Sequence, residues 1–261
     1  MAPLGISSGL MHTSWIEGGP AIQGSEYSIN FNGTNGYLDT GDTYQSTFRG
    51  SFTISTWVNL VDGGYLFGGV RNTSSTHHAV HLRVMGNGKI TLGFTAGGGG
   101  TYIETNSAVF TDGQTGWHNI TLVVTLNSSA NTTFVLYKNS GIQGITVHSG
   151  AVSDTQHAAY TTSDNPYIGA VNLNGSASGF TDGNMDDFAI WNVALDADAV
   201  AAMYNSGVPF DLTSNSGNYD NSGDLVGYWR FNEGSGTTAL DTGGSNNATL
   251  VGGATYSNDN V

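Results

Sequence analysis

The sequence predicts an all-β sandwich of two antiparallel sheets with one short helix, and three observations support this fold class. The 261 residues include 39 Gly and only 10% charged residues, a composition that suits turns and sheet surfaces rather than long helices. The apolar fraction of 38%, with 11% aromatic residues, is enough to bury a core. Short alternating runs recur between turn residues and amount to about 14 strands.

The segment Ser51–Leu60 shows the alternation most clearly. Phe52 and Ile54 fall on one face of the expected strand, and Ser55 and Trp57 fall on the other. A strand of this kind separates a buried face from a more polar one. We therefore expect Ser51–Leu60 to be a central strand of the sandwich.

Hairpins follow this strand. The turn Gly86–Gly88 contains Asn-Gly, which tolerates the positive φ of a tight turn, so His78–Met85 is expected to pair with Lys89–Thr95. The turn Lys138–Gly141 marks a second reversal of the chain. Further strands are expected at Ile120–Leu126, Thr132–Tyr137 and Ile142–Val147.

One helix interrupts the strands. Asp196 is a suitable N-cap for Ala197–Asn205, Asp198 lies in the first turn, and Gly207 follows the end. The helix has one apolar side, which we expect to lie on the sandwich. That side consists of Leu195, Val200, Met203 and Tyr204.

The chain divides into four parts. Residues 1–25 have weak periodicity and are expected to form an N-terminal arm, whereas residues 26–209 form the sandwich. The polar stretch 210–224 is expected to be a linker loop. Residues 225–261 supply a strand pair, and because two strands alone are not stable, this pair must complete the sandwich or pair with another subunit.

Charge and Cys content exclude several classes of function. With a net charge of −14 and only six Lys and Arg, neither nucleic acid nor an anionic membrane is an expected partner. No Cys is present, so disulfide and thiolate chemistry are absent.

The start, Met1–Gln23, lacks the basic and apolar regions of a signal peptide. The acidity suits a calcium-rich extracellular setting, or it only maintains solubility.

Five segments resemble the laminin-G-like, concanavalin A-like lectin/glucanase jelly rolls. They are YSINFNGTNGYLD at 27–39, SFTISTWV at 51–58, WHNITLV at 117–123, GNMDDFAIW at 183–191 and YNSG at 204–207. These segments come in the order found in the family. The resemblance implies a laminin-G-like sandwich, of the kind also found in phage virion proteins.

The tail adds to this resemblance. The segment LVGYWRFNEGSGTT at 225–238 is similar to the stretch that precedes the first strand in the family, as though the domain were circularly permuted. Because the termini of compact domains often lie close together, a domain can tolerate such a rearrangement without a change of fold. We hypothesise that residues 225–256 lie beside the strand at Tyr27–Phe31.

The sequence does not show the catalytic pattern of the superfamily's glucanases. Those enzymes use paired carboxylates on one strand face, but none of the four Glu residues has a second acid two positions away in a strand. Asp186 and Asp187 are adjacent, so a regular strand would direct them to opposite faces. We therefore expect no enzymatic activity.

The resemblance implies a structural calcium ion. Family members often hold Ca²⁺ between the turn after the first strand and the closing strand, which transfers here to Asn32, Gly33 and Asp187, with Asp186 as a further ligand. Asp39, Asp42 and Asp182 are second choices. The alternative is that Asp187 is a buried carboxylate that accepts backbone N–H bonds.

Sugar binding needs an aromatic platform with polar partners. Trp57 stands among small polar residues, and Tyr65 and Tyr102 are the other candidates for carbohydrate contact, with Trp117 as a further one. The alternative for each is a place in the core, where large aromatic side chains are usually buried.

Two functions remain open at this stage. The first is a virion structural protein of a phage, part of a head decoration, fibre or tail, which joins other virion proteins through the arm 1–25 and forms a homo-oligomer. It would display the sandwich to host cell-surface glycans. The alternative is a calcium-dependent carbohydrate-binding or adhesion module of a secreted bacterial protein, located outside the cell or at its surface. Choosing between them depends on the site, because the fold hosts many functions.

Overall fold

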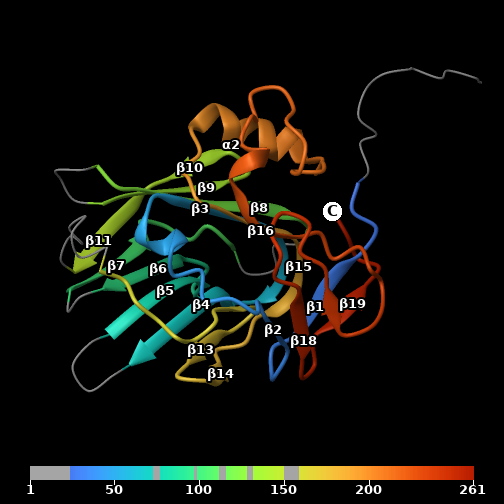
Figure 1. Cartoon of the computed structure of the whole chain (residues 1–261), viewed down its shortest axis with the longest axis horizontal. Coiled ribbons are helices and arrows are strands. Elements are labelled where there is room, and N and C mark those ends of the chain that lie inside the picture. The colour runs from blue at the N-terminus through green and yellow to red at the C-terminus, as the bar shows by residue number, and fades with distance from the viewer. Residues whose placement is uncertain (1–23, 73–76, 97–98, 112–115, 128–131, 150–158) are drawn as a thin grey trace, which may run out of the picture.

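The computed structural model describes residues 24–72, 77–96, 99–111, 116–127, 132–149 and 159–261. In these residues two sheets face each other across an apolar core, and one short α-helix lies outside them (Figure 1). Every described strand pair is antiparallel except the pair of β13 with β4. The predicted all-β sandwich with one short helix is confirmed.

The 8-stranded sheet has the order β10-β9-β8-β3-β15-β1-β19, and β16 pairs with β15 off this path. Its strands are β1 (Ser28–Asn32), β3 (Phe52–Asp62), β8 (His118–Thr125), β9 (Thr133–Lys138), β10 (Gly141–Gln143), β15 (Asp182–Trp191), β16 (Leu225–Trp229) and β19 (Thr255–Ser257).

The 11-stranded sheet has the order β11-β7-β6-β5-β4-β12-β2-β18-β17, with β13 beside β4 and β14 beside β13. Its strands are β2 (Tyr37–Asp39), β4 (Gly64–Asn72), β5 (His77–Val84), β6 (Ile90–Ala96), β7 (Gly99–Thr105), β11 (Ile145–Ser149), β12 (Tyr167–Ile168), β13 (Val171–Leu173), β14 (Ser176–Ser178), β17 (Thr238–Ala239) and β18 (Ala248–Val251).

The main core lies between the sheets and follows the predicted alternation. Phe52, Ile54 and Val58 of β3 belong to it, whereas Ser55 and Trp57 lie on the opposite face of the same strand, where they line a small cavity. The predicted hairpin is confirmed as well, because β5 and β6 pair on either side of the turn at Gly86–Gly88.

The strand predicted at Ile142–Val147 is wrong as a single element. Gly144 separates β10, which pairs with β9, from β11, which pairs with β7, so the chain passes here from one sheet to the other. The Gly144 carbonyl accepts a bond from the Asn106 N–H at 2.8 Å. A Cβ at this position would stand 2.8 Å from the Asn106 side-chain nitrogen, so a larger residue would displace the exposed Asn106 amide.

Helix α2 (Ala197–Tyr204) lies on the 8-stranded sheet, on the side away from the other sheet (Figure 1). The Asp196 side chain accepts a bond from the Ala199 N–H at 2.8 Å, as the capping pattern predicts. The helix ends one residue early, because Asn205 takes a left-handed conformation with φ 46°. Within the described chain, no helix has the length and apolar character needed to cross a membrane.

A second core lies between α2 and the 8-stranded sheet, and the polar stretch 210–224 contributes to it. Tyr219 is fully buried; its hydroxyl donates to the Leu212 carbonyl at 2.8 Å and accepts from Trp191 Nε1 at 3.1 Å. The stretch expected as a linker loop therefore packs a buried aromatic side chain against the sandwich. The short 3-10 helices are Thr47–Arg49, Asn205–Gly207 and Ser222–Asp224.

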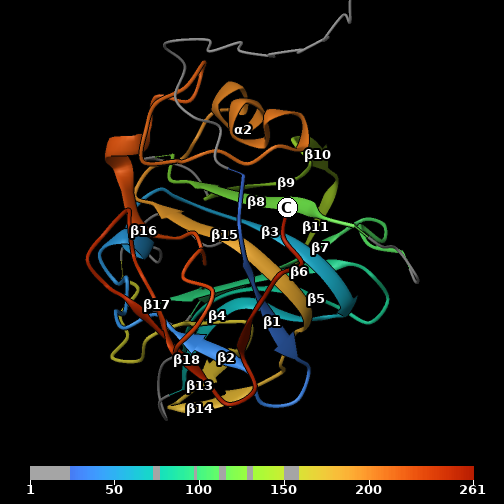
Figure 2. The same ribbon diagram turned by 90° about the vertical axis from the view of Figure 1, so that its right-hand side faces the viewer.

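The C-terminal segment lies along both sheets (Figure 2). β16 pairs with β15 and β19 with β1, whereas β18 pairs with β2 and β17 with β18. Of the residues 225–256 that the permutation hypothesis puts beside Tyr27–Phe31, only Thr255 and Tyr256 pair with β1, whereas β16, which carries the resemblance, pairs with β15. Trp229 of β16 is fully buried in the main core, and its Nε1 donates to the Asn246 carbonyl at 3.1 Å.

The arm expected at 1–25 lies outside the described residues as far as residue 23. From Ser25 onward the chain already contacts the C-terminal segment. The Glu26 N–H donates to Asn232 Oδ1 at 2.7 Å, and near the end of the chain Asn260 Nδ2 donates to the Glu26 carbonyl at 2.7 Å. The two ends of the described chain are therefore joined by hydrogen bonds.

Truncation of Trp229 tests the contribution of the C-terminal segment to stability. We expect Trp229→Ala to lower the free energy of unfolding by about 3–5 kcal/mol, because it removes a fully buried aromatic side chain from the main core. Urea unfolding followed by tryptophan fluorescence and circular dichroism measures the change. The control Leu240→Ala removes a side chain that is 48% exposed and should cost less than about 0.5 kcal/mol. Equal costs would contradict the assignment.

Candidate functional site

The structure does not bring the four calcium candidates together. Asn32 pairs with Asp182 at one end of β15, whereas Asp186 lies four residues further along this strand, roughly 13 Å away. Gly33 adjoins Asp182, since a Cβ at Gly33 would stand 3.0 Å from the Asp182 Cβ. Asp182, a second choice, is thus the acid nearest to Asn32 and Gly33.

Asn32 already has hydrogen-bond partners. Its side-chain oxygen accepts three backbone N–H bonds at 3.0 to 3.1 Å, from Thr34, Asn35 and Gly36. Asp39 Oδ1 likewise accepts from Gly41 N at 3.0 Å. Across the residues that the structure describes, no group of three or more His, Asp or Glu side chains is placed to share a metal ion. Calcium binding therefore stays a prediction.

Asp186 and Asp187 form a β-bulge in β15. Asp186 pairs with Trp57 and Ala189 with Ser55, so β15 contains one more residue than β3 between these pairs. Asp187 has a left-handed backbone with φ 46°, which is uncommon for a residue other than glycine. The bulge breaks the regular alternation that the sequence analysis assumes for these two acids, and both are buried.

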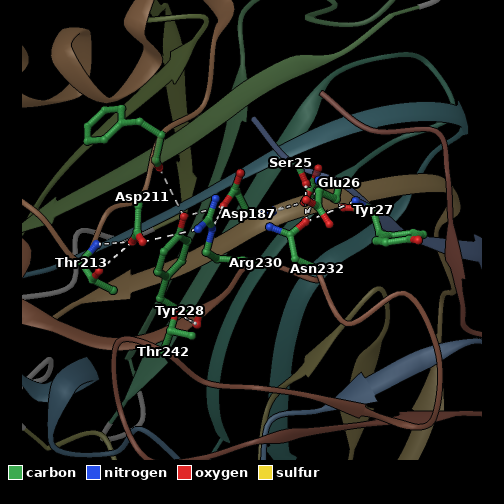
Figure 3. Close-up of polar contacts among 12 residues, drawn as sticks. Ser25, Glu26, Tyr27, Asp187, Asp211, Thr213, Tyr228, Arg230, Asn232 and Thr242 are labelled. Carbon is green, nitrogen blue, oxygen red and sulfur yellow. Dashed lines mark hydrogen bonds and ion pairs between the residues drawn. The ribbon is translucent and has the colours of Figure 1, made fainter. Parts of the chain in front are cut away.

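The bulge is joined to the C-terminal segment by polar contacts (Figure 3). Tyr228 donates its hydroxyl to Asp187 Oδ1 at 2.5 Å, and Arg230 Nε lies 3.9 Å from the same oxygen. Arg230 Nη1 also lies 3.4 Å from Asp211 Oδ2. Asp186 Oδ1 accepts the Asp187 N–H at 2.8 Å. Asp187 is thus buried, as the alternative interpretation expects, but its donor is the Tyr228 hydroxyl, and the backbone N–H bond is accepted by Asp186 instead.

Burial changes the acidity of this group of residues. It raises the pKa of Asp187 from 3.8 to about 6, although the Tyr228 hydroxyl and the Arg230 charge oppose this shift. Burial and the nearby charge of Asp187 raise the pKa of Asp186 well above its usual value, and the Ser25 hydroxyl opposes this. Because two adjacent buried carboxylates repel each other, the pair favours a state in which at least one of the two is protonated and neutral.

Trp57, a sugar-contact candidate, is covered. It is 4% exposed and its ring stacks on Tyr204 of α2, with centroids 5.7 Å apart. Together with Ser55, Asn119 and Asp187 it lines a cavity of about 10 Å³, space for about one water molecule. Trp117 donates its Nε1 to Asp259 Oδ1 at 3.2 Å, near the end of the chain.

Tyr65 and Tyr102 lie on the face of the 11-stranded sheet that is turned away from the core, which we call the outer face. Tyr65 of β4 pairs with Arg83 of β5, and Tyr102 of β7 pairs with Gly93 of β6. Tyr102 is 37% exposed, and its ring centroid lies 5.7 Å from that of His148. The outer face therefore brings two of the three proposed carbohydrate contacts onto one surface.

His81 lies between these two tyrosines. It pairs with Gly68 on one side and Gly93 on the other, and a Cβ at Gly93 would stand 1.9 Å from the His81 ring. The ring therefore uses the space that the missing side chain leaves open, and its edge contacts Tyr65 at a centroid distance of 5.5 Å. Burial and the charge of Arg83 lower the pKa of His81 to about 4, so the ring is neutral at pH 7.

His81, Arg83 and His148 also belong to this surface, although they were not among the residues expected to bind sugar. The signal was present for the first two, because alternation along the predicted strand His78–Met85 puts His81 and Arg83 on the face opposite Leu82 and Val84. No pattern in the sequence places His148 against Tyr102.

A second hollow lies at one end of the sandwich, between the tips of three chain reversals. It has a volume of about 750 Å³, within the range of small-molecule sites. Leu60, Met85 and Phe110 give it an apolar wall, and Asn59 and Asp62 stand at its polar side. This hollow lacks the paired aromatic side chains of the outer face.

Comparisons with known proteins agree with this architecture. The family described as "Concanavalin A-like lectin/glucanases superfamily" matches residues 32–201. No curated protein matches the chain.

Among solved structures, the chain is similar to a Bacteroides ovatus protein provisionally assigned to carbohydrate binding, with a TM-score of 0.57 and 17% identity. That match covers 90% of this chain but 60% of the other, so this chain spans less than two thirds of that protein. It is also similar to the CBM40 of the Ruminococcus gnavus IT-sialidase bound to alpha2,3 sialyllactose, with a TM-score of 0.52 and 14% identity, over 70% of this chain and 98% of that one. At these identities the likeness concerns the fold.

The buried acids predict a dependence of stability on pH. Because folding raises the pKa of Asp187 to about 6, the folded state binds the proton more tightly than the unfolded chain. The free energy of unfolding should therefore fall as pH rises from about 4 to 6 and stay lower above this range. Asp187→Asn should flatten this fall, measured by urea unfolding at a series of pH values. A profile unchanged from wild type, or an equal effect of Asp182→Asn on the same strand, would contradict this account.

Calcium binding is tested by thermal unfolding with Ca²⁺ and with a chelator. Under the calcium expectation, Ca²⁺ raises the melting temperature, because an ion that binds only the folded state stabilises it. Asp182→Asn should remove this shift if Asn32 and Gly33 take part, since Asp182 is the acid beside them. If Asp187→Asn removes the shift and Asp182→Asn leaves it, the ion binds at the bulge. No shift in the wild type would refute calcium binding.

Proposed function

We propose that the chain, which belongs to the concanavalin A-like lectin/glucanases superfamily, binds glycans through the outer face of its 11-stranded sheet. The observation that carries this proposal is the group of ring side chains on that face. Tyr65, His81, Tyr102 and His148 come from four strands and lie on the side away from the core. Rings of this kind provide apolar faces for sugar C–H groups and polar edges for hydroxyls.

The neighbourhood of these rings supports saccharide binding. Arg83 lies over the Tyr65 ring, 5.0 Å from its centroid, and Glu104 on β7 is two residues from Tyr102. Charged and amide groups beside an aromatic platform supply hydrogen bonds that fix a ligand's orientation. The carbohydrate-binding structures among the similar folds agree with this class of ligand, and the assignment to the outer face rests on the residues of this chain.

We propose binding without catalysis. The acids that come closest to a carboxylate pair, Asp186 and Asp187, are 0% and 4% exposed and are engaged by Asp187 N–H and by Tyr228. A glycoside hydrolase needs two carboxyl groups on either side of a sugar bond, and these acids do not reach a bound sugar on the outer face. Incubation with bound glycans should therefore release no reducing ends.

This proposal develops the alternative of the sequence analysis, a calcium-dependent carbohydrate-binding or adhesion module of a secreted bacterial protein, in its carbohydrate-binding part. The virion interpretation stays a prediction, since it depends on the arm 1–25, and none of the relatives named above is a virion protein. Sedimentation of the full chain and of a chain lacking residues 1–24 tests the arm and the expected homo-oligomer. An assembly that dissociates without the arm would favour the virion interpretation over a free-standing module.

Tyr102 is the first residue to test. We expect Tyr102→Ala to weaken glycan binding by about 5- to 30-fold, because it removes an exposed ring at the centre of the proposed surface. Binding is measured by a glycan array and then by calorimetry with the ligands found. Val208→Ala, which alters an exposed apolar residue just after α2, is the control and should leave affinity unchanged. If Trp57→Phe lowers the affinity and Tyr102→Ala does not, the proposed site is wrong. The glycan then binds on the 8-stranded sheet, at the face covered by α2.

A further inference from the structure

The few positive charges of this protein are concentrated on the 11-stranded sheet. The chain has six Lys and Arg and a net charge of −14. Arg71 lies on β4, Arg83 on β5 and Lys89 in the turn before β6, whereas Glu104 is the one acid in the sequences of β4, β5, β6, β7 and β11. Arg71 pairs with His78, three positions along β4 from the Gly68–His81 pair, and alternation therefore puts this position on the other side of the sheet. The outer face carries Arg83, Lys89 and Glu104, which leaves one excess positive charge there on an otherwise acidic protein.

Arg83 differs from four other cations. Each of these four has a carboxylate or carbonyl partner: Lys89 with Glu104 at 2.6 Å, Arg49 with Tyr160 O at 2.6 Å, Lys138 with Val109 O at 2.7 Å, and Arg230 with Asp211 at 3.4 Å. Within the described residues Arg83 has no ion pair, and its Nε is buried without a hydrogen-bond partner. Its charge is available to a ligand.

The position of Arg83 suits a planar anion. Its guanidinium lies over the Tyr65 ring at 5.0 Å, and stacking of this kind restrains the group while its two Nη groups, unlike the buried Nε, stay free to donate. Two parallel N–H bonds from a guanidinium match the geometry of a carboxylate or a sulfate oxygen pair. The neighbouring His81 ring adds no positive charge at pH 7, so Arg83 is the charged centre of this part of the face.

Glu104 does not compete with such an anion. It pairs with Thr91 of β6, which in turn pairs with Arg83, so two strand spacings, roughly 10 Å, separate its backbone from that of Arg83. Its carboxylate is held by Lys89, and that hydrogen bond lowers the pKa of Glu104. Lys89 and Glu104 thus neutralise each other, and the excess charge lies at Arg83.

We propose that the glycan bound on the outer face is acidic, and that the Arg83 guanidinium binds its carboxylate or sulfate group. This inference rests on the proposed glycan binding and specifies the class of saccharide. Tyr65 orients the guanidinium, and Tyr102 with His148 contacts the neighbouring part of the sugar chain.

The test compares matched pairs of saccharides by calorimetry. Galacturonic acid oligosaccharides are compared with galactose oligosaccharides, and sulfated galactose oligosaccharides with unsulfated ones. We expect the wild type to prefer at least one acidic member of these pairs by about tenfold or more, because charge-assisted fork bonds are the stronger kind. The carboxylate and sulfate arms identify which anion is bound.

Arg83→Gln should abolish this preference, because it lowers the affinity for the acidic saccharides about tenfold or more and that for the neutral ones much less. Lys89→Gln is the matched control, because it removes the same charge from the same face but from a cation that Glu104 already neutralises. Arg83→Lys, which retains the charge and loses the fork, should also lose most of the preference. Circular dichroism and thermal unfolding of each variant verify that the sandwich is intact.

The outcomes separate this inference from the proposed function. If Lys89→Gln lowers the preference as much as Arg83→Gln, the preference comes from the overall charge of the outer face. A specific contact between Arg83 and the anion is then refuted. Equal binding of acidic and neutral saccharides also overturns the inference, while glycan binding stands. Binding of none of the saccharides here or on the array would refute both.

Discussion

The arrangement of the whole chain depends on how β15 shares one of its edges between two strands. Its first half, up to Met185, pairs with β1, and its second half, from Phe188, pairs with β16. The bulge at Asp186 and Asp187 lies where the partner changes, while β3 continues along the other edge. This shared edge joins the beginning of the described chain to its C-terminal segment. Tyr228 and Arg230, from that segment, then contact the bulge itself.

The sequence predicted the elements whose causes are local. The alternation in β3, the Asn-Gly turn between β5 and β6, and the Asp196 cap of α2 each follow from neighbouring residues. The bulge could not be predicted from the sequence. It lies where the partner of β15 changes from β1 to β16, and both strands are distant from β15 in the sequence. The break at Gly144 was missed for the same reason, since one alternating run was divided between two sheets. Tyr219, in a stretch of polar composition, is buried by Trp191 and α2, which composition does not reveal.

The two outer faces of the sandwich differ, and this difference decides among the aromatic candidates. On the 8-stranded sheet, α2 and the stretch 210–224 form a second core, so Trp57 and Trp191 are buried there. On the 11-stranded sheet Tyr102 stays exposed, and Tyr65, His81 and Arg83 are half-buried beside it. Alternation alone assigns Trp57 and Tyr65 equally to a polar face. What separates them is the element that packs on top, which is a tertiary property.

The pairing of β1 with β19 also determines how the molecule responds to tension. Ser28 pairs with Ser257, so the two ends of the described chain leave the sheet from the same end of an antiparallel pair. A force that separates these ends opens β1 from β19 one hydrogen bond at a time, as a zipper opens, rather than shearing all of them together. The bonds of Asp259 to Asn59 and Asn184 at 3.1 and 2.6 Å are among the first to carry the load. The edge yields before the rest of the 8-stranded sheet, and the outer face of the other sheet lies away from the path of the force.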